Sequence, residues 1–190
     1  MIEDLDFYQI TRQLFADFQS GFFFYTLVYF GFRFSKRKEK LREFDRCATI
    51  CICIGSVLFF LFWAGTIAYY RIFEDESWRS FYDRLTGPYG FSIWVPMIMY
   101  MFLPQLLWVN KLRENYLSRF VIAFLLFFSF EKFVIIVTSF HRDYLPSSWS
   151  MEANSYLPYI LLGILWKFGI FTAPTAILFS VRAKKDNFAA

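Results

Sequence analysis

The chain has 190 residues, of which 57% are hydrophobic and 19% are charged, and its mean hydropathy is positive. A soluble domain of this length could not bury so much apolar surface, so the composition predicts a membrane protein. The formal net charge is +4, but the basic residues lie in short turns between apolar runs, which argues against nucleic-acid binding. The start, MIEDLDFYQITRQ, is acidic and unlike a secretory signal, so we expect the first helix to be retained.

Five apolar runs follow one another along the chain. A helix needs about 20 residues to cross the hydrocarbon core of a bilayer. Continuous runs of this kind favour helices over the alternating strands of a barrel. The first run is the shortest, and we expect its helix to extend backwards by an amphipathic turn or two. The sequence thus predicts one all-α domain, a polytopic membrane helical bundle with about five transmembrane helices at residues 18–34, 47–70, 89–108, 120–140 and 155–181.

The basic residues between these runs alternate from side to side. Seven Lys and Arg residues lie in residues 33–46, three in 111–119 and three in 182–185, whereas only five lie on the opposite side, one in the N-terminal segment and four in the outer connections. The positive-inside rule therefore predicts five crossings, with the N-terminus outside and the C-terminus inside. The longest outer connection, RIFEDESWRSFYDRLTGPYG at residues 71–90, is either a docked amphipathic segment or a solvated loop.

Two of the runs contain charged residues near their middle. Glu131 and Lys132 interrupt the fourth run, and Lys167 interrupts the fifth. An isolated charge at that depth costs at least about 2.5–3.5 kcal/mol on insertion scales, so such groups face the protein interior, pair or titrate. The simplest arrangement is an ion pair in which Glu131 meets Lys167 or Lys132 across neighbouring helices.

Helical spacing extends these charges into a polar stripe. At about 100° per residue, Glu131, Thr138 and Arg142 share one face, over a rise of about 16 Å. His141, the only histidine, lies at the outer end of the stripe and changes charge near neutral pH. Three interpretations stay open, namely a structural ion pair, a proton path and a substrate site. The candidate proton-path residues are Glu131, Lys132, Thr138, His141, Arg142, Asp143 and Lys167.

Other polar and reactive residues give weaker signals. Gln105 is a further polar helix site, next to the helix-kinking Pro104, and Pro174 is a second candidate kink. The three cysteines cluster in CATICIC at the start of one apolar run and lack the spacing of a haem or iron–sulfur site. With a single histidine, the chain has no pair of axial ligands for haem. We therefore expect no cofactor, no metal site and no self-contained catalytic centre in this chain.

Two stretches carry a resemblance to a known family. FEKFVIIVTSFHRDYLPSSW, residues 130–149, resembles the pattern E-[RK]-F-V-I-[IV]-V-T-S-L-H-R-D-[FY]-L-P-S-S-W. That pattern occurs in the quinol-linked membrane subunits of alternative complex III, of the polysulfide-reductase (NrfD-like) family. YMFLPQLLWVNKLREN, residues 100–115, resembles a helix of the same family that ends in Pro-Gln-Leu-Leu-Trp before a basic turn. The resemblance covers residues 88–149 and corresponds to the family's second helical bundle.

The resemblance implies a respiratory setting. It implies an integral, multi-pass subunit of a quinol-oxidising complex in a bacterial cytoplasmic membrane, with haem and iron–sulfur clusters in partner subunits. It also implies roles in a proton path for Glu131, His141, Arg142 and Asp143. The family has eight or more transmembrane helices, and its first bundle has no counterpart here, so contact of this chain with quinol stays open. The alternatives are a purely structural or assembly subunit and an independent small transporter or channel.

Overall fold

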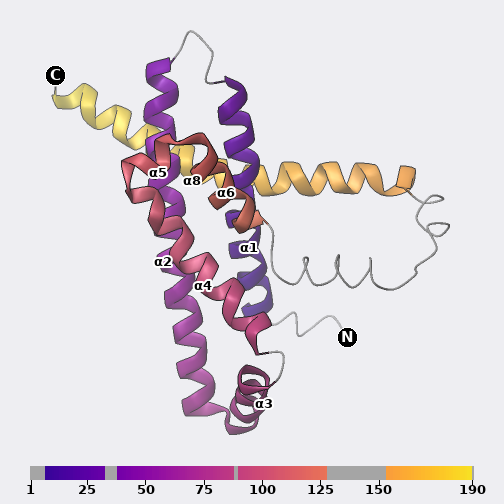
Figure 1. The fold of residues 1–190 in the computed structure, drawn as a ribbon. Helices are drawn as coiled ribbons and strands as arrows, with labels where there is room; N and C mark the ends of the chain where they lie inside the picture. Colours follow the sequence, from indigo (N-terminus) through magenta and orange to yellow (C-terminus); the bar gives the residue numbers. More distant parts are fainter. Residues whose placement is uncertain (1–6, 33–37, 88–89, 128–152, 190) are drawn as a thin grey trace.

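The computed structural model describes residues 7–32, 38–87, 90–127 and 153–189, which are helical almost throughout and contain no strand. The predicted all-α fold is therefore confirmed. The elements are α1 (Phe7–Phe32), α2 (Lys38–Phe73), α3 (Asp75–Thr86), α4 (Phe91–Gln105), the 3₁₀ turn η1 (Leu106–Trp108), α5 (Asn110–Glu114), α6 (Tyr116–Phe127) and α8 (Ala153–Ala189) (Figure 1).

The two helices α1 and α2 form the long axis of the molecule (Figure 1). α2 has 36 residues, which corresponds to a length of about 54 Å. The predicted span 47–70 lies inside it. α1 begins at Phe7 rather than at residue 18, so the expected backward extension amounts to about three turns. Among the described residues, two helical stretches are long and apolar enough to cross a membrane: Glu39–Phe73 and Pro158–Lys184.

The predicted outer connection contains a helix instead of a solvated loop. α3 follows α2 after a break at Glu74, whose φ and ψ are −136° and 78°. Its apolar residues recur at helical spacing along one side of the helix. Trp94 of α4 donates from Nε1 to the carbonyl oxygen of Leu85 at 3.3 Å, which fixes the last turn of α3 to α4.

The helix α8 departs from an upright bundle. It has 37 residues, continues through Pro158 and Pro174, and runs across α1, with its first half extending beyond the other labelled helices (Figure 1). Gly21 of α1 lies at this crossing. A Cβ atom added there would meet the carbonyl oxygen of Lys167 and would lie 2.7 Å from the Cβ of Phe171. The missing side chain therefore lets the two backbones approach closely at one point.

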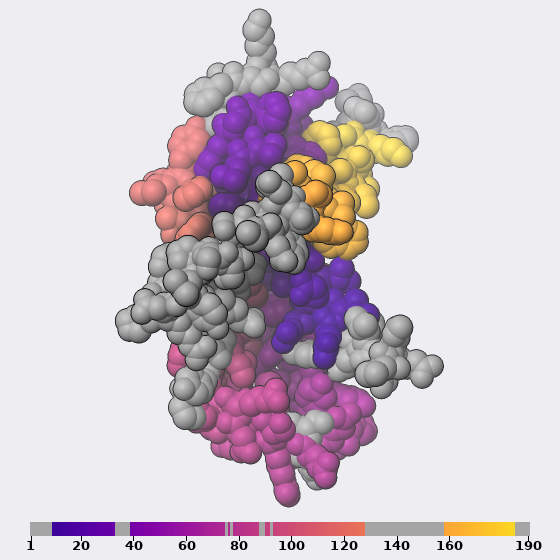
Figure 2. Space-filling model, turned by 90° about the vertical axis from the view of Figure 1, so that its right-hand side faces the viewer, coloured from indigo at the N-terminus to yellow at the C-terminus, as the bar shows by residue number. Residues whose placement is uncertain are grey.

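The core is built largely from aromatic side chains around this crossing. Phe171 of α8 is fully buried, and its ring centroid lies 5.5 Å from that of Phe22 and 5.4 Å from that of Tyr25. A second set of rings joins α1 to α6, where Phe23 stacks on Phe127 at 4.9 Å. Figure 2 shows α8 in orange against α1 in indigo, with α3 at the base in pink. The core thus places α1 in contact with α6 and α8.

Candidate functional site

Most of the predicted polar stripe lies outside the described residues. This holds for Glu131, Lys132, Thr138, His141, Arg142 and Asp143. The predicted ion pairs between Glu131 and either lysine therefore stay predictions. Lys167 and Gln105 are described, and both contact residues that the sequence pattern did not indicate as their partners.

Lys167 pairs with α1. Its Nζ atom lies 3.7 Å from Oδ1 of Asp17, and the two side chains are 23% and 10% exposed. Gln13, one turn earlier in α1, donates from Nε2 to the same oxygen at 3.1 Å. The Lys167–Asp17 distance exceeds the usual 3.2 Å limit of an N–H···O hydrogen bond, so this is a loose charge pair. It lies beside the Gly21 crossing, one turn before Phe171 on α8.

Gln105 connects the end of α4 to the middle of α2. Its Nε2 donates to the carbonyl oxygen of Cys53 at 3.0 Å and to Oγ of Ser56 at 2.6 Å, and its Oε1 accepts from Nε1 of Trp108 at 2.8 Å. Cys53 returns a contact, from Sγ to the carbonyl oxygen of Pro104 at 3.1 Å. Both the nitrogen and the oxygen of this amide thus have hydrogen-bond partners, and the side chain holds the end of α4 against α2.

Pro104 explains a second polar contact in the same region. Proline has no N–H, so the carbonyl oxygen four residues earlier, on Tyr100, lacks its usual partner within the helix. Gln19 of α1 donates from Nε2 to that oxygen at 3.4 Å. Helix α4 ends at Gln105, one residue after the proline, and continues as the tighter turn η1. The predicted kink is therefore an end of the helix.

The strongest polar cluster joins the start of α2 to the start of α6. Arg119 donates from Nη1 to Oδ2 of Asp45 at 2.8 Å and from Nη2 to Oδ1 at 2.5 Å. Tyr25 of α1 donates its hydroxyl to Oδ1 of Asp45 at 3.1 Å. The Arg119 and Asp45 side chains are only 3% and 8% exposed. We call Tyr25, Asp45 and Arg119 the buried clamp, because the three side chains hold α1, α2 and α6 together at one end.

Aromatic rings enclose the cation of the buried clamp. The guanidinium carbon of Arg119 lies 4.6 Å from the ring centroid of Tyr29 and 5.6 Å from that of Phe22. Guanidinium groups over aromatic faces are stabilised by the ring quadrupole, more strongly where water is excluded. A bidentate carboxylate and two rings thus compensate part of the cost of burying this charge. Within the described part of the chain, Nε of Arg119 has no hydrogen-bond partner.

The sequence interpretation missed both described ion pairs. Arg119 was counted among the basic residues of a loop, and neither Asp45 nor Asp17 was given a role. A signal was present for the first pair: an acid and a base each come within one or two residues of an apolar run, on the side that the charge pattern assigns as inner. The sequence also marks the start of α6 with Asn115, a residue type that favours the N-cap position. Its Oδ1 accepts from the backbone N–H groups of Leu117 and Ser118 at 2.9 and 3.4 Å.

The described residues contain no group of three or more His, Cys, Asp or Glu side chains that could hold a metal ion. Comparisons of the chain with protein-family models, with curated proteins and with solved structures found no match. The polar groups described above therefore serve as contacts between helices. The buried clamp holds three helices together. The looser ion pair of Lys167 with Asp17 places one positive and one negative group at the α1–α8 crossing.

Proposed function

We propose that this chain is an integral membrane subunit of a respiratory, quinol-oxidising complex of the alternative complex III type, and that it packs against other subunits. The observation that carries the membrane part is the uncovered apolar surface of α8. Within Pro158–Lys184 only 11% of an apolar 18-residue stretch is buried, against 44% of the corresponding stretch of α2. Side chains such as Leu162, Leu165 and Trp166 are more than half exposed. Lipid and partner helices are the surroundings in which such a surface is stable.

The respiratory part rests on the sequence of residues 130–149 and its resemblance to the alternative complex III subunits. In this proposal the chain crosses a bacterial cytoplasmic membrane five times, with its N-terminus outside, and in the assembled complex α8 lies more nearly along α1 and α2 than it does in Figure 1. Glu131 carries protons at mid-membrane, and His141, Arg142 and Asp143 form the outer relay. The partner subunits hold the haem and iron–sulfur clusters, and contact of this chain with quinol stays open.

Copurification tests the setting. The chain is expressed with a C-terminal tag in its native membrane and extracted in a mild detergent, and the copurifying proteins are identified by mass spectrometry. We expect membrane and peripheral subunits that carry haem and iron–sulfur clusters. Recovery of the chain alone as a homo-oligomer would contradict the proposal and support an independent transporter or channel.

The proton role is tested with Glu131→Gln, which keeps the shape of the side chain and removes its titratable group. We expect quinol oxidation to lose its coupling to proton translocation while the complex still assembles. Glu114→Gln is the matched control, because Glu114 is an exposed residue in the connection at α5. Unchanged coupling in an assembled Glu131→Gln complex would remove Glu131 from the proton path.

A purely structural subunit is the second candidate, and the Lys167–Asp17 pair favours it. This lysine has a carboxylate partner on α1. A structural role predicts that either single change, Lys167→Leu or Asp17→Leu, reduces the yield of assembled complex. The double change should restore the yield, because it leaves no unpaired charge. Restored assembly with lost proton coupling in the double variant would instead assign the Lys167–Asp17 pair to the path.

A further inference from the structure

We propose that α3 is an interfacial helix that lies at the level of the lipid head groups, with the side chain of Tyr82 in the lipid interface and that of Ser80 in water. This inference rests on the proposed membrane insertion of α2. It assigns a lipid-binding surface to a segment that the sequence left undecided between a docked helix and a loop.

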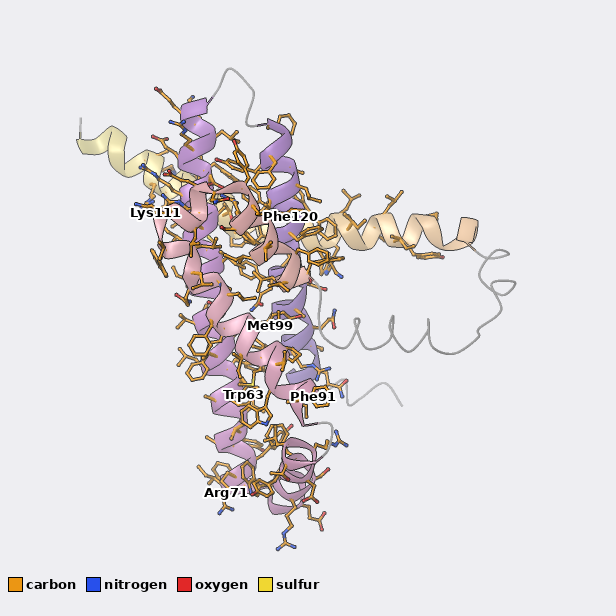
Figure 3. All side chains as sticks on the ribbon, in the orientation of Figure 1. Trp63, Arg71, Phe91, Met99, Lys111 and Phe120 are labelled. Carbon is orange, nitrogen blue, oxygen red and sulfur yellow. The ribbon has the colours of Figure 1, made fainter. Side chains whose placement is uncertain are left out.

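The depth of α3 follows from the length of α2. The uncharged part of α2 lies between Arg46 and Arg71, which are about 37 Å apart at 1.5 Å per residue. The hydrocarbon core is about 30 Å thick. With Arg46 at one head-group layer, Arg71 therefore lies at the other. Because α3 begins four residues after Arg71, its first turn is at head-group depth. Figure 3 shows Arg71 at the lower end of the molecule, and Lys111 and Phe120 in the upper part.

The side chains of α3 are distributed as expected for a helix at head-group depth. Its apolar residues form a stripe about 100° wide, made of Trp78, Phe81, Tyr82 and Leu85. Trp78 and Phe81 are partly covered by the protein, whereas Tyr82 at the edge of the stripe is 52% exposed. Aromatic side chains with a polar tip are typical of the membrane–water interface.

The neighbouring end of α2 exposes the same kind of surface. Tyr69, Ile72 and Phe73 are 52%, 70% and 71% exposed, and the rings of Tyr69 and Phe73 lie 5.3 Å apart. The guanidinium of Arg71 lies over the ring of Trp78, at 5.5 Å from its centroid, so a cation at the end of the span is joined to the aromatic stripe. Exposed apolar groups at this end are thus continuous with the proposed membrane span.

The charges of α3 indicate which lipid it needs. Acidic residues crowd its start, at Glu74, Asp75 and Glu76, and Arg84 lies in its last turn, an order that the helix dipole favours. Since acids outnumber arginines in residues 74–86, attraction to an anionic surface does not hold the helix. We therefore expect α3 to bind zwitterionic phospholipid, with the aromatic stripe supplying the binding energy.

Spin-label depth measurements on the full-length chain test this proposal. The three natural cysteines are replaced by alanine, and single cysteines are introduced as Tyr82→Cys, Ser80→Cys and Leu58→Cys. The chain is placed in phosphatidylcholine nanodiscs, and accessibility of each label to oxygen and to a water-soluble nickel chelate is measured. Tyr82 and Ser80 are about 200° apart around the helix, so they are matched controls within one turn. Elution as a single species checks that each variant is folded.

We expect the label at Tyr82 to be more accessible to oxygen, at a depth of about 5–10 Å, and the label at Ser80 to be more accessible to nickel. Equal accessibilities at the two positions would overturn the proposal. The label at Leu58, which is 51% exposed in the middle of α2, distinguishes a failure of the interfacial helix from a failure of the proposed membrane insertion of α2. If its label lies deep in lipid while that at Tyr82 lies in water, only the interfacial helix fails. If its label also lies in water, the proposed insertion of α2 fails with it.

Discussion

The buried clamp allows a quantitative prediction about stability. In the variant Arg119→Met, Asp45 loses both hydrogen bonds from the guanidinium and keeps only the hydroxyl of Tyr25. The remaining carboxylate would be 8% exposed and without a counter-ion among the described residues of the clamp. Removing one partner of a buried ion pair costs about 3–5 kcal/mol. We expect the free energy of unfolding to fall by this amount.

The same reasoning predicts a different result when both charges are removed. Replacing a buried pair by apolar side chains of similar volume is often neutral or stabilising, because neither charge then has to be desolvated. The double variant Asp45→Leu, Arg119→Met should therefore be more stable than Arg119→Met alone. A double-mutant cycle isolates the interaction energy between the two sites.

Unfolding in mixed micelles of increasing dodecyl sulfate content, followed by tryptophan fluorescence, gives the required free energies. Lys111→Met is the control, since Lys111 is exposed and surface changes stay within about 0.5 kcal/mol. An additive cycle, in which the double variant loses the sum of the two single losses, would refute the assignment of Asp45 and Arg119 as a coupled pair.

Three further changes test other contacts in the same unfolding assay. Gly21→Ala should destabilise by about 1–3 kcal/mol, because its Cβ would overlap backbone atoms of α8; Gly31→Ala, whose Cβ would have open space, should not destabilise, and equal effects would contradict the proposed crossing. Gln105→Leu should cost about 1–3 kcal/mol through its lost contacts to α2, and no loss would mean that α4 is held otherwise. Lys167→Met should lower the free energy of unfolding by less than Arg119→Met, since the Lys167–Asp17 ion pair has a longer N···O distance and is more exposed to solvent. A larger loss in Lys167→Met would contradict this expectation.

The sequence was a good guide to helix content and to the core of α2, because long apolar runs report directly on helices that bury or insert. It also indicated the amphipathic extension of α1, and it left residues 71–90 open between a docked segment and a solvated loop. It was a poor guide to where helices end around Pro104, since the outcome depends on a donor, Gln19, that comes from another helix. It gave no hint that α8 runs across α1, which is decided by the contact at Gly21.

The sequence predicted some of the charged residues of the candidate site and none of their partners on other helices. The sequence identified charges in the middle of apolar runs, and Lys167 does make an ion pair. Its partner Asp17 was missed because it precedes the apolar run of α1 and looked like a surface residue. Arg119 was counted as a loop cation, although its side chain folds back over Phe22 and Tyr29. Pairing across helices is a tertiary property, so one-dimensional spacing finds the charges and leaves their partners open.

The helix α1 decides the number of membrane crossings. It is not among the described helices that are long and apolar enough to cross a membrane, because it contains several polar residues. Those residues are buried by the protein: Asp17 pairs with Lys167, Gln19 is fully buried against α4, and Tyr25 belongs to the buried clamp. Hydropathy counts every side chain as lipid-facing, whereas polar groups that face a protein partner are tolerated at depth. We therefore predict that α1 crosses the membrane.

Reporter fusions to the two ends of the chain test this prediction, with one reporter that is active only outside the cytoplasmic membrane and one that is active only inside. Five crossings, in the orientation that the distribution of basic residues predicts, place the N-terminus outside and the C-terminus inside. If α1 does not cross, four crossings remain and both ends report from the same side. Asp17→Leu together with Lys167→Leu serves as a control, because removing both charges makes α1 more apolar and should leave the N-terminus outside. An N-terminus inside in the unmodified chain would show that the polar contacts of α1 form at the membrane surface.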